Sequence, residues 1–224
     1  MKGRTGRTKR QFDVAPRGGY HGGMDNKLSI AMRYWLLGRN MHLALGALEF
    51  GAKFHKGFRK DGKTPEYQHQ LIIANYLRTF EHHLLNVEAT LATAFLHDVC
   101  EDYDVGFEEI ESKFGRSIST AVMLLTKKHR GEVIPPDIYY QKIAKDSRAS
   151  IVKGVDRIHN IQSMVDVFDE KKQKEYIEET KTLVLPMLKS ARREFTHQEG
   201  AYENLKFVLK NQIEMIEAIH RAKS

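Results

Sequence analysis

The sequence predicts an all-α protein, and three observations carry this prediction. Hydrophobic residues recur at spacings of three and four along most of the chain, no run alternates between hydrophobic and polar residues as a half-buried strand does, and no segment repeats itself. With 224 residues, of which 41% are hydrophobic, the chain is long enough to bury one sizeable core. We therefore expect a helical bundle with a helical C-terminal extension.

The first expected helices are separated by a basic loop. Residues 41–55 place hydrophobic side chains at helical spacing, and this helix is expected to end near Gly57. A basic loop over residues 59–65 follows, marked by a glycine and a proline. A second helix is expected to begin its buried face at His69, and a third begins near Val87.

The remaining helices follow from periodicity and from helix-breaking residues. Helices are expected over residues 107–114, closed by Gly115, and then over 118–125 and 139–143. Asp146 is expected to cap a further helix. Beyond residue 168 the chain becomes highly charged, yet residues 183–188 and 205–219 keep helical periodicity, with Pro186 expected to kink or interrupt the first of them.

The net charge of +7 is concentrated at the N-terminal end. Residues 1–23 hold six Lys and Arg residues against a single Asp, and a Gly-, Arg- and Thr-rich segment with few hydrophobic residues cannot pack. We expect residues 1–23 to form a disordered basic arm, which either contacts nucleic acid weakly or is only a solubilising terminus. Residues 24–168 are expected to form the main helical domain, with the helices of 169–224 packing on it.

No segment of the sequence predicts a membrane partner. No hydrophobic run approaches the roughly 20 residues needed to cross a bilayer, and no hydrophobic stretch follows the basic residues at the N-terminal end. The only cysteine, Cys100, cannot form an intrachain disulfide, which fits a reducing compartment. We therefore expect a cytoplasmic protein, and no pattern in the sequence indicates its oligomeric state.

Four side chains that can bind metal or exchange protons crowd into six positions at the end of a hydrophobic run: His97, Asp98, Glu101 and Asp102. Because residues three and four apart share a helix face, they are expected to converge on one patch. Burying such carboxylates costs on the order of several kcal/mol per ion unless a cation compensates. A bound divalent metal is the simplest explanation.

Two other expected helices each add a residue of ligand type, namely His69 and Asp156, and the order His, His-Asp, Asp matches the HD phosphohydrolase superfamily. Residues 97–102 resemble the His-Asp-x-x-Glu-Asp signature of the RelA/SpoT-type alarmone hydrolases, and residues 156–160 resemble their Asp-Arg-x-His-Asn signature. The resemblance covers roughly residues 41–165. The chain is more similar to a stand-alone small alarmone hydrolase than to the long RelA/SpoT enzymes.

The resemblance implies a metal-dependent site. The metal ligands would be His69, His97, Asp98 and Asp156, a mixed nitrogen and oxygen set that suits Mn²⁺, the metal that the resemblance favours, or another divalent transition metal. Glu101 and Asp102 would orient or deprotonate the attacking water.

The resemblance also suggests which residues bind the substrate: His55, Arg59, Lys60, Lys153, Arg157 and Asn160. Arg59 would flank the base, and Asn160 would lie near the metal and the sugar-phosphate. We interpret His55 as a hydrogen-bond partner of a ligand or a phosphate, in preference to a ligand of a second metal. The approach to His69 departs from the family pattern, with Tyr67 one place closer and Gln70 where proline is usual, so substrate identity stays open.

The leading hypothesis is hydrolysis of the 3′-pyrophosphate of (p)ppGpp, the alarmone of the stringent response, which gives GDP or GTP plus pyrophosphate. One alternative is another HD nucleotide phosphohydrolase that acts on NADPH, an adenine alarmone or a dNTP. A second alternative is a nucleic-acid-binding protein that uses the basic arm on an HD scaffold. The pair of acidic residues after the His-Asp dipeptide favours the pyrophosphohydrolase.

Overall fold

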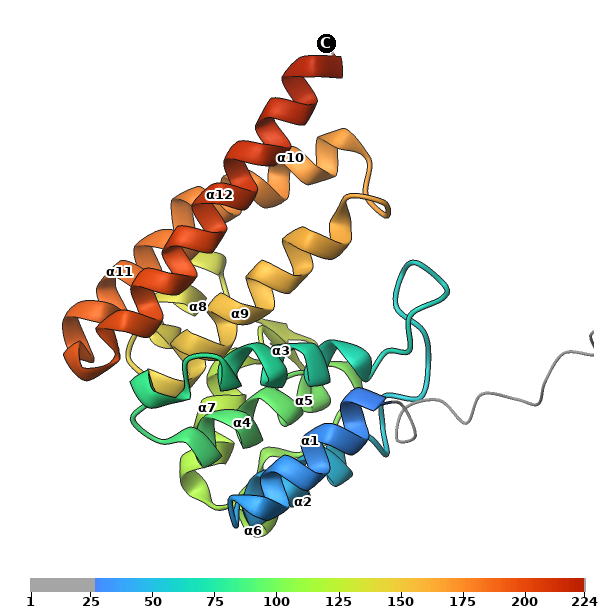
Figure 1. Ribbon diagram of the computed structural model, residues 1–224, viewed down its shortest axis with the longest axis vertical. Helices are drawn as coiled ribbons and strands as arrows, with labels where there is room; N and C mark the ends of the chain where they lie inside the picture. Colours follow the sequence, from blue (N-terminus) through green and yellow to red (C-terminus); the bar gives the residue numbers. More distant parts are fainter. Residues whose placement is uncertain (1–26, 224) are drawn as a thin grey trace, which may run out of the picture.

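The computed structural model describes residues 27–223, and within them the protein is all-α apart from one short hairpin (Figure 1). The hairpin pairs β1 (Lys128–His129) with β2 (Glu132–Val133) in antiparallel fashion. It is too short to show the hydrophobic alternation by which strands are recognised in a sequence. The predicted fold class is confirmed.

The N-terminal half of the described chain surrounds one central helix. Its helices are α1 (Lys27–Gly38), α2 (His42–Gly51), α3 (Gln68–Arg78), the 3₁₀ turn Glu81–His83, α4 (Val87–Leu96), α5 (Val99–Asp102), α6 (Phe107–Phe114) and α7 (Arg116–Leu125). Helix α4 packs against α2, α3, α7 and α9, and its residues 89–96 are all buried. Asn86 caps α4, because its side chain accepts a hydrogen bond from the backbone N–H of Ala89.

The C-terminal half adds a long helix and an extension that covers it. Its helices are α8 (Pro136–Ile143), α9 (Ser147–Met164), α10 (Glu170–Glu179), the π-helical segment Thr180–Val184, α11 (Leu185–Glu194), the 3₁₀ turn Thr196–Gln198 and α12 (Glu199–Lys223). Asp146 caps α9 as expected, accepting hydrogen bonds from the backbone N–H groups of Arg148 and Ala149. In Figure 1, α12 runs alongside α11 and α9.

The sequence prediction and the structure differ at several helix boundaries. The helix expected to end near Gly57 ends at Gly51. The helix that begins at Val87 ends at Leu96, and a turn at His97 and Asp98 separates it from the short helix α5. The continuous helix expected through residues 97–102 is therefore interrupted at the His-Asp dipeptide. Pro186 lies in the first turn of α11, and the helical path continues through it. The regular α-helix is interrupted just before it by the π-helical segment, which accommodates a residue without a backbone N–H.

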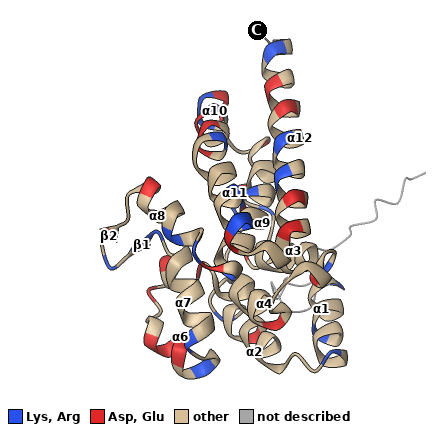
Figure 2. Ribbon diagram, turned by 90° about the vertical axis from the view of Figure 1, so that its left-hand side faces the viewer, with Lys and Arg blue, Asp and Glu red and all other residues tan. Residues whose placement is uncertain are grey.

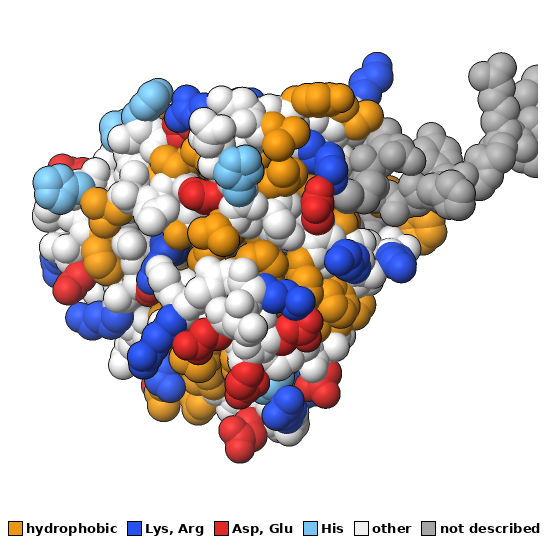
Figure 3. All heavy atoms as spheres, turned by 90° about the horizontal axis from the view of Figure 1, so that it is seen from below, with side chains coloured by type: hydrophobic (Ala, Val, Ile, Leu, Met, Phe, Trp, Pro, Cys, Tyr) orange, Lys and Arg blue, Asp and Glu red, His pale blue; other side chains and the backbone are white. Residues whose placement is uncertain are grey.

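Charged residues lie mainly on the outside of the bundle. Figure 2 shows residues of both signs along α10 and α12, and Figure 3 shows hydrophobic side chains interspersed with charged ones on the face seen from below. No helix among residues 27–223 is both long enough and hydrophobic enough to span a membrane. The predicted basic arm lies outside the described residues, and the domain boundary at residue 168 stays a prediction.

Candidate metal centre and adjoining cavity

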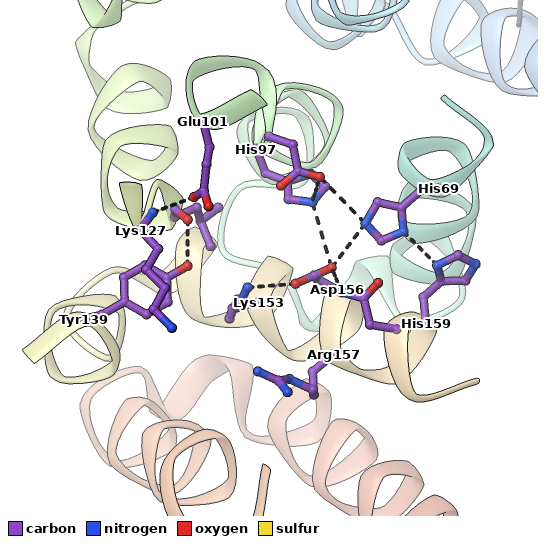
Figure 4. Close-up of polar contacts among 12 residues, drawn as sticks. His69, His97, Glu101, Lys127, Tyr139, Lys153, Asp156, Arg157 and His159 are labelled. Carbon is purple, nitrogen blue, oxygen red and sulfur yellow. Dashed lines mark hydrogen bonds and ion pairs between the residues drawn. The ribbon is translucent and has the colours of Figure 1, made fainter. Parts of the chain in front are cut away.

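Three segments distant in sequence bring histidine and aspartate side chains together in the interior. His69 comes from the first turn of α3, His97 and Asp98 from the turn between α4 and α5, and Asp156 from the middle of α9 (Figure 4). One ligand atom each from His69, His97 and Asp156 lies within 4.8 Å of the other two. Asp98 Oδ2 lies 2.9 Å from His97 Nε2 and 3.9 Å from His69 Nε2.

The turn after α4 fixes the orientation of the His97 ring. Its Nδ1 donates a hydrogen bond to the backbone carbonyl oxygen of Ala94, 2.9 Å away, which directs Nε2 toward the site. Nε2 is buried and lies against the Asp98 carboxylate, with no other hydrogen-bond partner among residues 27–223. Burial alone would lower the pKa of His97. The negative charges of Asp98 and Asp156 outweigh burial and raise this pKa to about 9.

Asp156 is buried and is held on both carboxylate oxygens. Its Oδ1 accepts a hydrogen bond from Asn160 Nδ2 at 2.6 Å and lies 3.1 Å from His69 Nε2, while Lys153 Nζ donates to Oδ2 at 2.8 Å. Although burial alone would raise it, Lys153 and His69 hold the pKa of Asp156 well below its usual value. This carboxylate is therefore ionised and fixed in place.

His159 supports His69 from the side away from the cluster. The two Nδ1 atoms lie 2.7 Å apart, so one ring donates a hydrogen bond to the other. Burial lowers the pKa of His69, and burial together with the nearby His69 lowers the pKa of His159 to about 4. Both rings are therefore neutral, the form in which histidine binds a metal through a free nitrogen.

The donor set fits a divalent transition metal. Two imidazole nitrogens and two carboxylates suit such ions better than calcium, and the buried Nε2 atom of His97 faces only carboxylates that are themselves of ligand type. The hydrogen bonds to the far sides of His69 and His97 are of the kind that orient metal-binding histidines. Among residues 27–223 these groups could therefore hold a metal ion.

The two acidic residues of α5 point in different directions. Glu101 Oε2 accepts a hydrogen bond from the backbone N–H of Lys127 at 2.7 Å, which ties α5 to the segment before the hairpin (Figure 4). Asp102 lies closer to the second histidine-containing group, formed with His55 and Glu66. Partial burial and the charges of Asp98, Glu101 and Glu66 raise the pKa of Asp102 to about 6.

A cavity of about 530 Å³ adjoins the cluster, and its walls include all but one of the twelve residues predicted for the site. The exception is His97, which is 3% exposed and lies behind Asp98. A cavity of this size is typical of a small-molecule site.

Arg59, from the loop between α2 and α3, reaches across to α9, where its Nη2 donates to Asn160 Oδ1 at 3.1 Å. Lys60 Nζ lies 5.2 Å from the centre of the Phe168 ring at the same wall.

Two predicted substrate contacts already have partners inside the protein. Lys153 is paired with Asp156, as described above. Arg157 lies 3.3 Å from Glu179, donates to the hydroxyl of Tyr140 and stacks on the ring of Tyr176. Its guanidinium turns away from the histidine cluster in Figure 4.

Three residues of the site were not singled out as site residues from the sequence. His159 lies within the Asp-Arg-x-His-Asn motif, so the motif could have indicated it as a site residue. Gln70 donates from Nε2 to Asp98 Oδ2 at 3.5 Å and had been noted only as a departure from the family pattern. Lys127 lines the cavity; the sequence offered it as a candidate cationic contact within a segment that resembles the family, but it was not among the residues predicted for the site.

The fold and the cluster define a class: an all-helical domain whose inner helices present histidine and aspartate to one point. Residues 47–134 match the family profile described as an HD domain. This segment is therefore similar to HD domains, and the resemblance stated from the motifs is confirmed.

The chain is similar to named alarmone enzymes over part of its length. It is 32% identical over 148 residues to a probable guanosine-3′,5′-bis(diphosphate) 3′-pyrophosphohydrolase of Synechocystis sp. and 31% identical over 149 residues to the corresponding enzyme of Aquifex aeolicus. These matches cover 62% and 63% of the chain. They cover 19% and 20% of those proteins, so the chain spans about a fifth of the length of these relatives.

One solved structure shares the fold. It is that of a metazoan SpoT ortholog, described as hydrolysing ppGpp and acting in starvation responses. The TM-score is 0.60 at 23% sequence identity, and the match covers 77% of this chain and 94% of that one. The likeness extends the helical HD fold over most of the present chain.

Proposed function

We propose that the protein is a metal-dependent hydrolase that removes the 3′-pyrophosphate from guanosine alarmones, giving GDP or GTP plus pyrophosphate. The observation that carries this proposal is the meeting of two histidines and two aspartates at the edge of a cavity with a cationic wall. The relatives named as guanosine-3′,5′-bis(diphosphate) 3′-pyrophosphohydrolases support the choice of reaction.

We assign His69, His97, Asp98 and Asp156 as the ligands of a divalent metal and take this metal to be Mn²⁺. A bound ion of this kind lowers the pKa of water and neutralises phosphate charge. The chain contributes by holding the ligands in place: His159 and the carbonyl of Ala94 orient the two imidazoles, and Lys153 holds the far oxygen of Asp156.

Glu101 and Asp102 are assigned to water activation. Both carboxylates line the cavity, one turn of chain beyond the ligands Asp98 and His97. Glu101 is braced by the backbone of Lys127, so its free oxygen has a defined position. Asp102 has no such brace and is the better placed of the two to change its proton occupancy.

The substrate is proposed to lie along the wall formed by α9 and the loop before α3. Arg59 and Lys60 provide positive charge at the cavity wall, Asn160 donates to Asp156, and His55 also lines the cavity. Lys153 and Arg157 remain proposed contacts and act at the cavity wall, where each balances a carboxylate of the protein. Cytoplasmic location and weak nucleic-acid contact through residues 1–23 are proposed on the sequence alone.

Product analysis tests the function. Purified protein loaded with Mn²⁺ is incubated separately with guanosine and adenosine 3′-pyrophosphate nucleotides, NADPH and dNTPs, with the Asp98→Ala variant as the inactive control. We expect intact pyrophosphate together with GDP or GTP. Orthophosphate from NADPH, or triphosphate from a dNTP, in the absence of pyrophosphate release would contradict the proposal and favour another HD nucleotidase.

A further inference from the structure

A second group of metal-binding side chains lies beside the first. One ring nitrogen of His55 and one carboxylate oxygen each from Glu66 and Asp102 lie within 4.8 Å of one another. His55 comes from the segment just after α2, Glu66 from the loop before α3 and Asp102 from the end of α5. The group is thus assembled from three separate segments, as the first one is.

The histidine of this group is buried and incompletely paired. His55 is 2% exposed, its Nε2 lies 3.4 Å from Gln70 Nε2, and its Nδ1 has no hydrogen-bond partner among residues 27–223. If Nε2 accepts a hydrogen bond from the Gln70 amide, Nδ1 carries a buried N–H without an acceptor. In the other tautomer Nδ1 has a buried free lone pair. The second tautomer leaves a nitrogen that can bind a cation.

The negative charge of the group is not balanced by the protein. Glu66 and Asp102 form no ion pair with a lysine or arginine of the described chain, and Asp98 lies close enough to influence both His55 and Asp102. The hydroxyl of Tyr103 donates to Glu66 Oε2 at 2.5 Å, which holds that carboxylate toward the group and leaves Oε1 free. Carboxylates gathered in this way are stabilised when a bound cation compensates their charge.

We propose that His55, Glu66 and Asp102 hold a second divalent cation next to the predicted metal centre, and this assignment replaces the role expected for His55 from the sequence. One imidazole and two carboxylates form an oxygen-rich set, which suits Mn²⁺ or Mg²⁺. Gln70 separates the two sites, since its amide nitrogen lies 3.5 Å from Asp98 and 3.4 Å from His55. The second cation would face the same cavity, because all three of its ligands line it.

The proposal concerns metal binding and does not depend on which nucleotide the protein cleaves. It gives a role to Glu66, to which the sequence motifs assigned none. A carboxylate has two oxygens, so Asp102 can bind the cation through one and contact water through the other.

Manganese titration of the full-length protein tests the second site. Chelator-treated protein is titrated with Mn²⁺, free Mn²⁺ is followed by electron paramagnetic resonance, and bound metal is measured by elemental analysis. We expect two ions per chain in the wild type, with spectral broadening from their proximity. The Glu66→Gln variant should bind one ion fewer than the wild type and lose the broadening.

The exposed Glu111→Gln variant, on α6, serves as the matched control and should bind as the wild type does. Circular dichroism checks that each variant is folded, and Asp102→Asn replaces Glu66→Gln if the latter is not. A folded Glu66→Gln or Asp102→Asn variant that binds as many ions as the wild type would overturn the proposal. So would a wild type that binds a single ion at saturation.

Discussion

The two sides of α9 are held by different forces. Toward the cavity, Lys153 and Asn160 form a partly buried polar network around Asp156. Toward α11 and α12, the same helix packs so closely that a Cβ on Gly154 would come within 2.7 Å of Leu205 Cδ1. The hydrophobic side holds the helix in place, while the polar side is arranged for binding and contributes little net stability. Mutations on the two sides should therefore separate function from stability.

The largest expected effect is on the polar side, at a metal ligand. The Asp98→Ala variant should lose bound metal and lose turnover by about 1,000-fold or more, because the ion supplies several kcal/mol of charge stabilisation. Elemental analysis and product assays measure both quantities. An Asp98→Ala variant that keeps its metal and its activity would show that the cluster that Asp98 forms with Asp156 of α9 does not bind the metal.

Asp102 should affect turnover more than it affects the first metal. We expect Asp102→Asn to reduce turnover by about 100-fold, within the usual range for general acid-base groups. The Glu101→Gln variant should also lose turnover while keeping the first metal, but to a smaller extent, because an amide oxygen can still accept the hydrogen bond from Lys127. Larger losses in Glu101→Gln than in Asp102→Asn would reverse the assignment.

His159 should act through His69. Replacing it in a His159→Ala variant should weaken metal affinity by about 10- to 100-fold, the usual effect of removing a partner that orients a ligand. Metal titration measures the loss, and the exposed Gln162→Ala variant on the same helix is the control. Equal affinity in both variants would mean that the contact between the two rings has no role in the site.

The hydrophobic interior should respond in stability. A Cβ at Gly51 would lie 2.5 Å from the backbone oxygen of Phe95, so Gly51→Ala should lower the free energy of unfolding by about 2–3 kcal/mol. At Gly46 the nearest atom is 3.6 Å away, so Gly46→Ala should be tolerated. Urea unfolding compares the two, and similar stabilities would contradict the close packing of α2 on α4.

The smallest effect is expected at the cap of α9. The Asp146→Ala variant should be less stable by about 1 kcal/mol at neutral pH. Although burial opposes ionisation, hydrogen bonds from Arg148 and Ala149 lower the pKa of Asp146 in the folded state. Its contribution is therefore present above the unfolded pKa of about 3.9 and is lost as the pH falls below it.

Urea unfolding of the wild type and the Asp146→Ala variant over a range of pH measures this contribution. We expect the difference between them to shrink as the pH falls below about 4. A constant difference would exclude the carboxylate as the cause.

Much of the fold could be predicted because its helices carry local signals. The cap at Asp146 and the stop at Gly115, where φ is 86°, were visible in the sequence. The turn at His97 was not, because nothing between Leu96 and Val99 resembles a helix breaker. At that turn the chain makes tertiary contacts, among them that of Asp98 with His69 Nε2 from α3.

The site was predictable where motifs carried it and not where partners came from distant segments. Sequence alone could not reveal that Arg157 would meet Glu179, 22 positions later, or that Glu101 would bind the backbone of Lys127. Long-range contacts of this kind are fixed by packing, which leaves no mark on local spacing. Glu66 was hidden for the same reason.

The most direct test of the account is anomalous diffraction from crystals grown with Mn²⁺. We predict a manganese peak within coordination distance of His69 Nε2, His97 Nε2 and the carboxylates of Asp98 and Asp156. Manganese bound only elsewhere, with these four side chains in the positions described, would contradict the assignment of the metal centre.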